Sequence, residues 1–297
     1  MKPVPLFNAS GCLDALAAPS VANRFDVFVT KTITPIVRAG NPTPRIAETE
    51  HGILNSIGLQ GPGIDGLVDR VLPRLRETLT ARLWVSVGGF SVADYVTVCE
   101  RLDAEEGVEA LELNLSCPNV EEAPESAAVI VAAVRSVSGK PLFAKLSPAA
   151  WDVGETARAV AAAGADGLSL VNTLKGMAFD ERSGRPKLAR GIGGYSGPAL
   201  RPVALACVHA CATAVELPIV GMGGVGSAEH VLDLVRAGAS GVAIGTALFS
   251  DPGLPERLRT ELAALTRASG DAISTRHDLR SVVRSGKPLQ MVHNVLA

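Results

Sequence analysis

Aromatic and charged side chains are scarce in this chain of 297 residues, at 4% and 20% of the composition. The 28 Lys and Arg nearly balance the 30 Asp and Glu, which leaves a formal net charge of −2. A nucleic-acid surface needs a basic patch or stripe, so we expect no nucleic-acid partner. No apolar run approaches the ~18 residues of a transmembrane helix, so no membrane association is expected. The first residues lack the apolar stretch of a signal peptide, which favours a cytoplasmic protein.

Cysteine is also rare, and its five positions follow no metal-binding or disulfide pattern: Cys12, Cys99, Cys117, Cys207 and Cys211. A disulfide framework would favour an even count in a much shorter secreted chain. No spacing matches a zinc or iron–sulfur site, so we predict no metal. Cys207 and Cys211 lie four residues apart in an apolar stretch, which predicts two small buried side chains on one helix.

Short apolar runs rich in Val, Ile and Leu are abundant. Each is too short for a helix and lies close to Gly, Pro or polar turn residues, which is typical of buried strands. Seven runs are clear, and a weaker one at 51–59 brings the count to eight: 26–33, 82–89, 110–116, 141–147, 167–173, 218–224 and 241–247. Helix-like stretches lie between them. The clearest covers 227–241 and opens on Ser227, a favoured N-cap residue.

Strands that alternate with helices predict a parallel sheet, and eight such units in about 250 residues predict an α/β fold of the (β/α)₈, or TIM barrel, type. Composition does not change sharply along the chain, and no low-complexity linker appears. We therefore predict one domain spanning residues 1–297. An open doubly wound sheet is the alternative, which the number of units disfavours.

Polar side chains gather at the carboxyl ends of these predicted strands, where barrels of this type carry their chemistry. Two lysines and several carboxamides at successive strand ends predict a planar ligand with many hydrogen bonds. The residues at these ends are Lys31, Asn55, Ser86, Asn114, Lys145, Asn172 and Thr173.

Small residues follow the last two predicted strands, in GMGGV from Gly221 and AIGTA from Ala243. Glycines let backbone N–H groups approach an anion closely, and loops seven and eight of a barrel are its usual phosphate site. Turns use the same residues, but two such loops in this position predict a ligand that carries a phosphate.

The order and spacing of these motifs resemble those of the class 1 dihydroorotate dehydrogenases. The resemblance runs almost from end to end and rests on KTIT, GNPTPR, NSIGLQGPG, LNLSCPN, KPLFAKLSP, VNTLKGMAFD, GGYSGPALRPVAL, GMGGV and IGTALF. GGYSGPALRPVAL and NTLKGMAFD look more like the 1B subgroup. The resemblance implies FMN as the cofactor and oxidation of dihydroorotate to orotate in pyrimidine biosynthesis. It also implies a homodimer, with a second subunit that carries FAD and an iron–sulfur cluster and passes electrons to NAD.

The resemblance also implies roles for individual residues. Contacts with FMN are expected from Ser10, Lys31, Thr32, Ser86, Asn114, Lys145, Val171, Gly197, Gly223, Gly224, Gly245 and Thr246. Contacts with the substrate are expected from Lys31, Asn55, Ser56, Ile57, Gly58, Leu59, Asn114, Asn119, Asn172 and Thr173. Cys117 would be the base that takes the substrate proton, because a thiol with cations nearby can ionise near neutral pH. The competing interpretation of Cys117 is a packed structural thiol, and that of Asn119 is a turn residue.

Two positions depart from the family pattern. Ser86 stands where the family usually has Asn, and the loop from Val120 is short and acidic where 1B relatives usually carry a longer glycine-containing loop. The C-terminal segment from Arg276 matches no motif. None of the five histidines shares a motif, and we expect none to be catalytic.

Three alternatives remain open. A sister flavin enzyme could act on dihydrouracil or another reduced pyrimidine. A flavin-free isomerase or synthase would explain the glycine loops but not Lys145 or the asparagines. A binding module could hold FMN without turnover.

Overall fold

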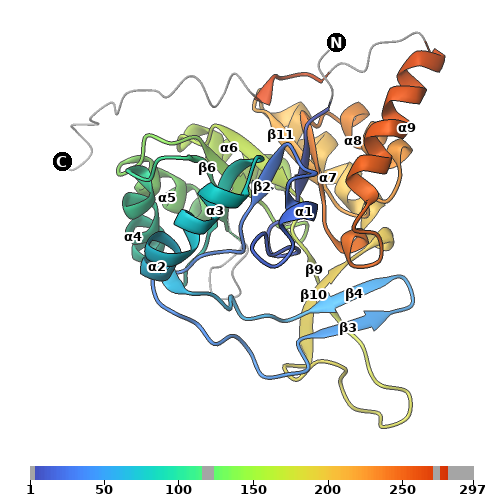
Figure 1. Ribbon diagram of the computed structural model, residues 1–297, viewed down its shortest axis with the longest axis horizontal. Coiled ribbons are helices and arrows are strands. Elements are labelled where there is room, and N and C mark those ends of the chain that lie inside the picture. Colours follow the sequence, from blue (N-terminus) through green and yellow to red (C-terminus); the bar gives the residue numbers. More distant parts are fainter. Residues whose placement is uncertain (1–3, 116–123, 270–274, 280–297) are drawn as a thin grey trace.

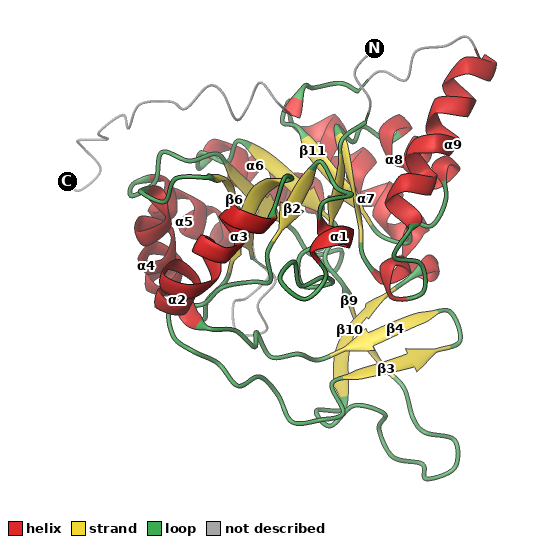
Figure 2. Ribbon diagram, in the orientation of Figure 1, coloured by secondary structure: helices red, strands yellow, loops and turns green. Residues whose placement is uncertain are grey.

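A computed structural model describes residues 4–115, 124–269 and 275–279 of the chain. Cys117 and Asn119 lie outside the described residues, as does most of the C-terminal segment. Eight parallel strands close into a barrel in the order β1-β12-β11-β8-β7-β6-β5-β2 (Figures 1 and 2). These strands are β1 (Leu6–Asn8), β2 (Val27–Val29), β5 (Arg82–Val87), β6 (Val108–Asn114), β7 (Leu142–Lys145), β8 (Gly167–Leu170), β11 (Ile219–Met222) and β12 (Gly241–Ile244). The predicted (β/α)₈ barrel is confirmed.

Helices connect the barrel strands and form an outer layer around them (Figure 2). The longer ones are α3 (Leu72–Thr78), α4 (Val92–Asp103), α5 (Pro124–Arg135), α6 (Val153–Ala162), α7 (Arg201–Ala214), α8 (Ala228–Arg236) and α9 (Leu254–Ser269). Shorter turns of helix are α1 (Pro19–Ala22), α2 (Gly63–Gly66), a π-helical turn (Leu67–Val71) and two 3₁₀ turns (Pro198–Leu200 and Thr246–Phe249). No helix in the described ranges is long and apolar enough to cross a membrane.

Several helices begin at residues whose side chains accept a hydrogen bond from the first turn. Ser91 caps α4, Asp152 caps α6 and Ser227 caps α8, each by accepting from the backbone N–H three residues later. The predicted start of α8 is confirmed. Cys207 and Cys211 lie buried on α7, as their spacing predicted.

One predicted barrel strand is wrong. The segment at 51–59 does not join the barrel, and the first barrel strand is Leu6–Asn8 instead. All three residues of β1 are buried, but its short length and polar Asn8 conceal it in the sequence. Residues Gly52–Asn55 form β4 of a separate sheet, in which most residues are only half-buried. Because β1 takes the place of this segment in the count, the third to eighth barrel strands are the ones that the sequence predicted.

The separate sheet has four antiparallel strands in the order β3-β4-β10-β9. They are β3 (Ile46–Thr49), β4, β10 (Ile192–Ser196) and β9 (Leu174–Met177). Segments from two distant parts of the sequence therefore build one sheet, which lies beyond the carboxyl ends of the barrel strands (Figure 1). This sheet gives the barrel mouth a second wall.

The barrel interior is packed rather than hollow. Trp84 contacts Phe7 edge-to-face at 5.0 Å between ring centroids and Phe143 at 4.3 Å. Leu279 belongs to the same cluster, is 1% exposed and packs against Gly241 at the start of β12. Leu279, from the described part of the C-terminal segment, therefore packs into the amino end of the barrel.

Candidate active site

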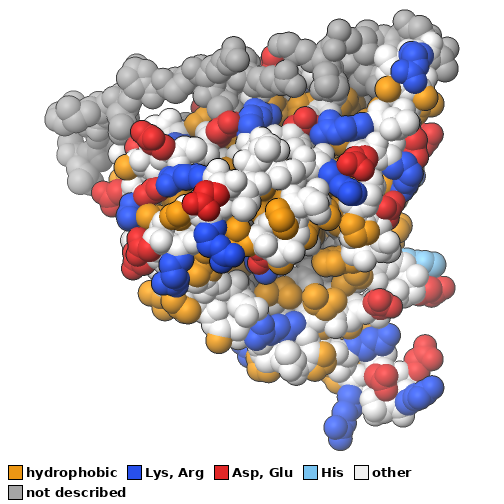
Figure 3. Space-filling view, in the orientation of Figure 1, with side chains coloured by type: hydrophobic (Ala, Val, Ile, Leu, Met, Phe, Trp, Pro, Cys, Tyr) orange, Lys and Arg blue, Asp and Glu red, His pale blue; other side chains and the backbone are white. Residues whose placement is uncertain are grey.

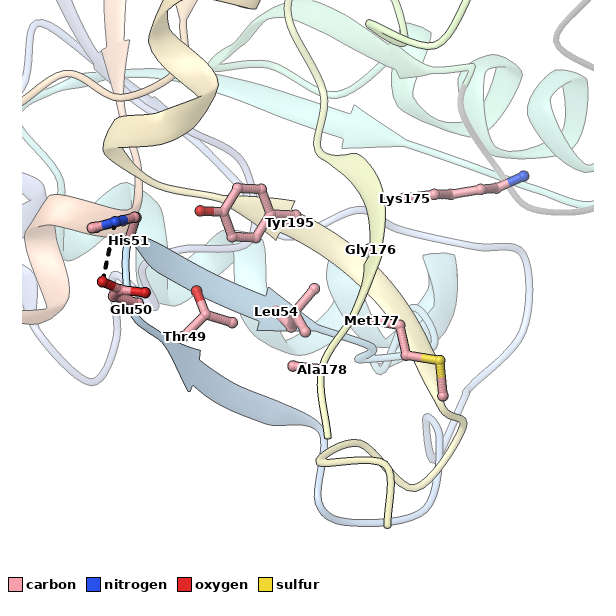
Figure 4. A pocket seen from close by; sticks show the side chains of 9 residues that line it. All are labelled: Thr49, Glu50, His51, Leu54, Lys175, Gly176, Met177, Ala178 and Tyr195. Atoms are coloured by element: carbon pink, nitrogen blue, oxygen red, sulfur yellow. Dashed lines mark ion pairs between the residues drawn. The ribbon is translucent and has the colours of Figure 1, made fainter. Parts of the chain in front are cut away.

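A cavity of about 830 Å³ lies between the barrel mouth and the four-stranded sheet. This volume lies in the usual range for cofactor and ligand pockets. A second hollow of about 350 Å³ lies against the four-stranded sheet (Figure 4) and is lined by Leu54, Met177 and Tyr195, among others. At its edge Nε2 of His51 lies 3.5 Å from Oε1 of Glu50. None of the residues predicted for the site lines this smaller hollow, so the larger cavity is the candidate active site.

A chain of hydrogen-bonded side chains crosses the cavity floor. The Asn172 carboxamide donates to Oδ1 of Asn114 at 2.9 Å, and Nδ2 of Asn114 donates to Oγ1 of Thr32 at 3.2 Å. Oγ1 of Thr32 lies 3.1 Å from Oγ of Ser86. The backbone N–H of Thr173 donates to Oδ1 of Asn172 at 2.8 Å. Each carboxamide is therefore held in one orientation by its neighbours.

Ser86 lies beneath the residues of the cavity floor and is not one of them. Its side chain is fully buried and does not line the cavity, whereas Thr32, Asn114, Asn172 and Thr173 do. The hydroxyl of Ser86 thus reaches the cavity through Thr32. The flavin contact predicted for Ser86 from the sequence stays a prediction.

Lys145 brings a buried positive charge to the same floor. The residue is only 4% exposed, and its ammonium donates to Oγ of Ser10 at 2.8 Å. The ammonium also lies 3.4 Å from Oε1 of Glu112, which is 2% exposed. Glu112 was not predicted from the sequence, although it lies two residues before Asn114 on β6 and therefore points to the same side of the sheet.

The loop after β4 contributes alternate residues to the cavity. Asn55, Ile57 and Leu59 line it, and Nδ2 of Asn55 donates to the carbonyl of Gly194 at 3.1 Å. Ser56 and Gly58 do not line it. Oγ of Ser56 accepts from the Asn41 carboxamide at 2.9 Å, and a Cβ at position 58 would lie 2.5 Å from Oδ1 of Asn41. Three of the five predicted substrate residues in this loop therefore line the cavity, and two lie against the loop behind it.

Three glycine-bearing loops meet at one side of the cavity, where Gly197, Gly223, Gly224, Gly245 and Thr246 all line it. Gly197 and Gly224 have positive φ angles of 122° and 69°. A Cβ on Gly224 would lie 2.8 Å from Cβ of Arg201 and 3.1 Å from the carbonyl oxygen of Gly197. The backbone N–H groups of Gly224 and Gly245 donate to no atom of the described residues. Small residues and free N–H donors of this kind suit an anion such as a phosphate.

The remaining predicted residues lie at the rim and on the walls. Ser10 and Val171 line the cavity, and Lys31 lies at its edge with half of its side chain exposed, 3.8 Å from Asp14. Cys12, which the sequence did not single out, also lines the cavity. Burial raises the pKa of the Cys12 thiol, and the charge of Lys145 opposes this only in part. Cys12 is therefore a neutral thiol at neutral pH.

Comparison with known proteins identifies the family. The family model for dihydroorotate dehydrogenase matches residues 3–266. The chain belongs to the dihydroorotate dehydrogenase family. The dihydroorotate dehydrogenase B (NAD(+)) catalytic subunit of Bacillus pumilus is 44% identical over 278 residues, covering 90% of this chain and 89% of the relative. That of Halalkalibacterium halodurans is 45% identical over 258 residues, 84% of each chain. These similarities confirm the 1B-like assignment made from the motifs.

A solved structure shows the same fold. Dihydroorotate dehydrogenase of Eimeria tenella, in complex with ferulenol, superposes with a TM-score of 0.76 over 90% of this chain and 82% of that one, at 24% identity. FMN is the cofactor of this family. The described cavity fits it, because the glycine loops offer free N–H groups for a phosphate while Lys145 and the carboxamides offer donors for a ring.

Proposed function

We propose that this chain is the catalytic subunit of an FMN-dependent dihydroorotate dehydrogenase, which oxidises dihydroorotate to orotate in pyrimidine biosynthesis. The observation that carries the proposal is that a phosphate-type loop cluster and a floor of fixed carboxamides with a buried lysine share one cavity. A flavin-free isomerase would need the loops but not the floor.

Two sets of residues would hold FMN. The loops of Gly197, Gly223, Gly224, Gly245 and Thr246 would bind the phosphate through backbone N–H groups. Ser10, Thr32, Asn114, Lys145 and Val171 would contact the ring, with Lys31 at its edge and Ser86 acting through Thr32. FMN supplies the hydride-accepting chemistry when it is bound.

The substrate would lie over the same floor, between it and the loop after β4. Asn55, Asn114, Asn172 and Thr173 can donate to and accept from the amide edges of a pyrimidine ring. Lys31 is the half-exposed cation at the mouth and suits the carboxylate that distinguishes dihydroorotate from dihydrouracil. This charge match favours dihydroorotate over the sister substrate.

Proton abstraction is assigned to Cys117, which lies outside the described residues together with Asn119. The assignment rests on the LNLSCPN motif that follows β6. Strand β6 delivers Asn114 to the cavity floor, and Cys117 follows three residues later. The base removes one substrate proton while a hydride leaves the neighbouring carbon, so that two hydrogens leave the ring in all.

We further propose that the chain works as a homodimer with a second subunit that carries FAD and an iron–sulfur cluster. The support is the similarity to B-type catalytic subunits, together with a sequence that has no cysteine spacing for such a cluster. The four-stranded sheet and the loop after β9 expose apolar side chains suited to a protein contact, at Ile46, Met177, Phe179 and Ile192. Co-purification from the native cell, followed by mass measurement in solution, tests both contacts. The cytoplasmic location stays a prediction.

A dye-coupled assay with the purified, FMN-loaded chain tests the activity. Dihydroorotate should reduce an artificial acceptor such as dichlorophenolindophenol, and dihydrouracil should not. Lys31→Met should weaken use of dihydroorotate mainly through KM, because it removes the charge partner of the carboxylate. A preference for dihydrouracil would favour the sister enzyme. A chain that binds no FMN would favour a flavin-free barrel, and a yellow chain without turnover would favour a binding module.

A further inference from the structure

A buried ion pair lies in the barrel interior, directly beneath the proposed flavin site. Glu112 and Lys145 are 2% and 4% exposed, and their charged groups lie 3.4 Å apart. The surrounding interior is largely apolar, with Phe7, Trp84 and Phe143 among its members. A carboxylate in such surroundings is costly unless it is paired. Packing alone would be served better by an apolar residue, so the position of Glu112 calls for another reason.

The contacts of Lys145 point to that reason. In the described part of the chain its ammonium has two hydrogen-bond partners, Ser10 and Glu112, although it has three N–H donors. Lys145 pairs with Asn114 across β6 and β7 and lines the cavity, whereas Glu112 does not line it. Glu112 therefore holds the Lys145 ammonium from the barrel interior. The third N–H of the ammonium is available to a ligand in the cavity.

We propose that Glu112 is a positioning residue that anchors Lys145 and offsets its charge, and thereby sets the reduction potential of the flavin bound above it. The inference rests on the proposed FMN site and deepens it. The reduced ring carries more negative charge than the oxidised ring, and a charge near the ring tunes its electronics. A lysine balanced by a carboxylate stabilises the reduced form less than an unbalanced one, since unit charges a few ångströms apart interact strongly in a poorly hydrated interior.

The direction of the effect follows from this balance. Glu112→Gln keeps the shape and a hydrogen-bond acceptor but removes the negative charge. The cavity floor then has one more net positive charge, which favours the reduced flavin. The midpoint potential should rise. A merely structural ion pair would change stability on this substitution but would leave the potential of the bound flavin where it was.

The same strand offers a matched control. Glu109 lies near the amino end of β6, three residues before Glu112, and pairs with Arg82 at 3.7 Å without lining the cavity. Glu109→Gln removes the same charge from the same strand, but near the end of the strand that lies away from the cavity. It should leave the flavin potential unchanged.

The test is an anaerobic, dye-equilibrated reductive titration of the FMN-loaded wild type, Glu112→Gln and Glu109→Gln. Glu112→Gln should raise the midpoint by about 30 mV or more, which is a tenfold change in the relative affinity for reduced and oxidised FMN in a two-electron couple. An unchanged or lowered midpoint in a yellow Glu112→Gln protein would overturn the proposal.

If Glu112→Gln does not fold or load, Glu112→Asp replaces it. The shorter side chain keeps the charge but moves it away from the ammonium, so the midpoint should rise by less; a midpoint equal to that of the wild type would overturn the proposal. A wild-type chain that takes up no FMN at all would instead overturn the flavin site, and this inference with it.

Discussion

The side chains at the cavity floor are linked to one another by hydrogen bonds. Thr32, Asn114 and Asn172 form one hydrogen-bonded chain, and Lys145 is held between Ser10 and Glu112. A substitution at one member releases its neighbours, and such networks are usually worth more than the sum of their pairs. Effects of substitutions at Asn114 and Asn172 are therefore expected to be non-additive.

Cys117→Ala tests the proposed base. The variant should keep its FMN and bind orotate, because the thiol is needed for chemistry rather than for binding. Positioned bases contribute about 10²- to 10⁴-fold, so reduction of the flavin by dihydroorotate should slow by at least ~100-fold. Anaerobic stopped-flow absorbance gives this rate. Cys207→Ala, a buried thiol on α7, is the control and should keep the wild-type rate; a Cys117→Ala protein that does the same would make Cys117 a packed thiol.

The buried cysteines predict a loss of stability at alkaline pH. Burial raises the pKa of Cys211 to about 12 and also raises the pKa of Cys99 and Cys207. Above about pH 9 the unfolded chain loses these protons while the folded chain keeps them, so the free energy of unfolding falls as pH rises. Cys211→Ala should reduce this fall by about 1 kcal/mol between pH 9 and 10, as measured by denaturant titrations. An identical pH slope in the variant and the wild type would contradict this assignment.

At the scale of elements, the loops after β10, β11 and β12 form the proposed phosphate site. A substitution at Gly224 would not test this site alone. Any side chain there would clash with Arg201 and strain the backbone at its positive φ angle. Thr246 is better, since among the described residues its hydroxyl makes a side-chain hydrogen bond to Ser196 alone. Thr246→Asp places a negative charge against the phosphate and should abolish FMN binding, whereas Thr246→Val should retain most of it. Fluorescence titration of the apoprotein with FMN measures both, and tight binding by a folded Thr246→Asp protein would place the phosphate elsewhere.

Strand β1 is joined to β2 by hydrogen bonds of the Asn8 side chain as well as by backbone pairing. Its register with β2 has a single residue pair, and the buried Asn8 carboxamide supplies two more bonds by accepting from the Val29 N–H at 2.7 Å and donating to its carbonyl at 2.8 Å. Asn8→Ala leaves two buried backbone groups unpaired, at roughly 1–3 kcal/mol each. Stability should therefore fall by about 2–6 kcal/mol.

A matched asparagine provides the control for this substitution. Asn23 makes the same pair of bonds, to Thr78 and Thr80, but it is only half-buried and both bonds are exposed to solvent. Asn23→Ala should cost about 1 kcal/mol or less, because water replaces the lost partners. Equal losses for the two variants in urea titrations would show that burial is not what matters at Asn8.

For the molecule as a whole, the fold class could be predicted because strand and helix periodicities alternate clearly. The identity of one strand could not. Leu6–Asn8 is too short to show a period, whereas the 51–59 segment has strand-like residues that pair in another sheet. The single-domain prediction stays a prediction.

The site residues at the carboxyl ends of strands could be predicted from the sequence, but those deeper in the barrel or in loops could not. Strand-end polarity identified Lys145, Asn114 and Asn172, because the carboxyl ends of barrel strands meet at one mouth. Glu112 lies one layer deeper and Cys12 lies in a loop, and neither position carries a motif. Whether a loop residue such as Ser56 lines the cavity or lies behind it depends on tertiary contacts that no local pattern encodes.

The central claim is that dihydroorotate reduces an FMN held in the cavity between the barrel mouth and the four-stranded sheet. The most direct measurement is the absorbance of the purified, FMN-loaded chain near 450 nm under anaerobic conditions, as each reduced pyrimidine is added. We expect stoichiometric bleaching by dihydroorotate and none by dihydrouracil. A yellow protein whose absorbance does not change with dihydroorotate would contradict the account.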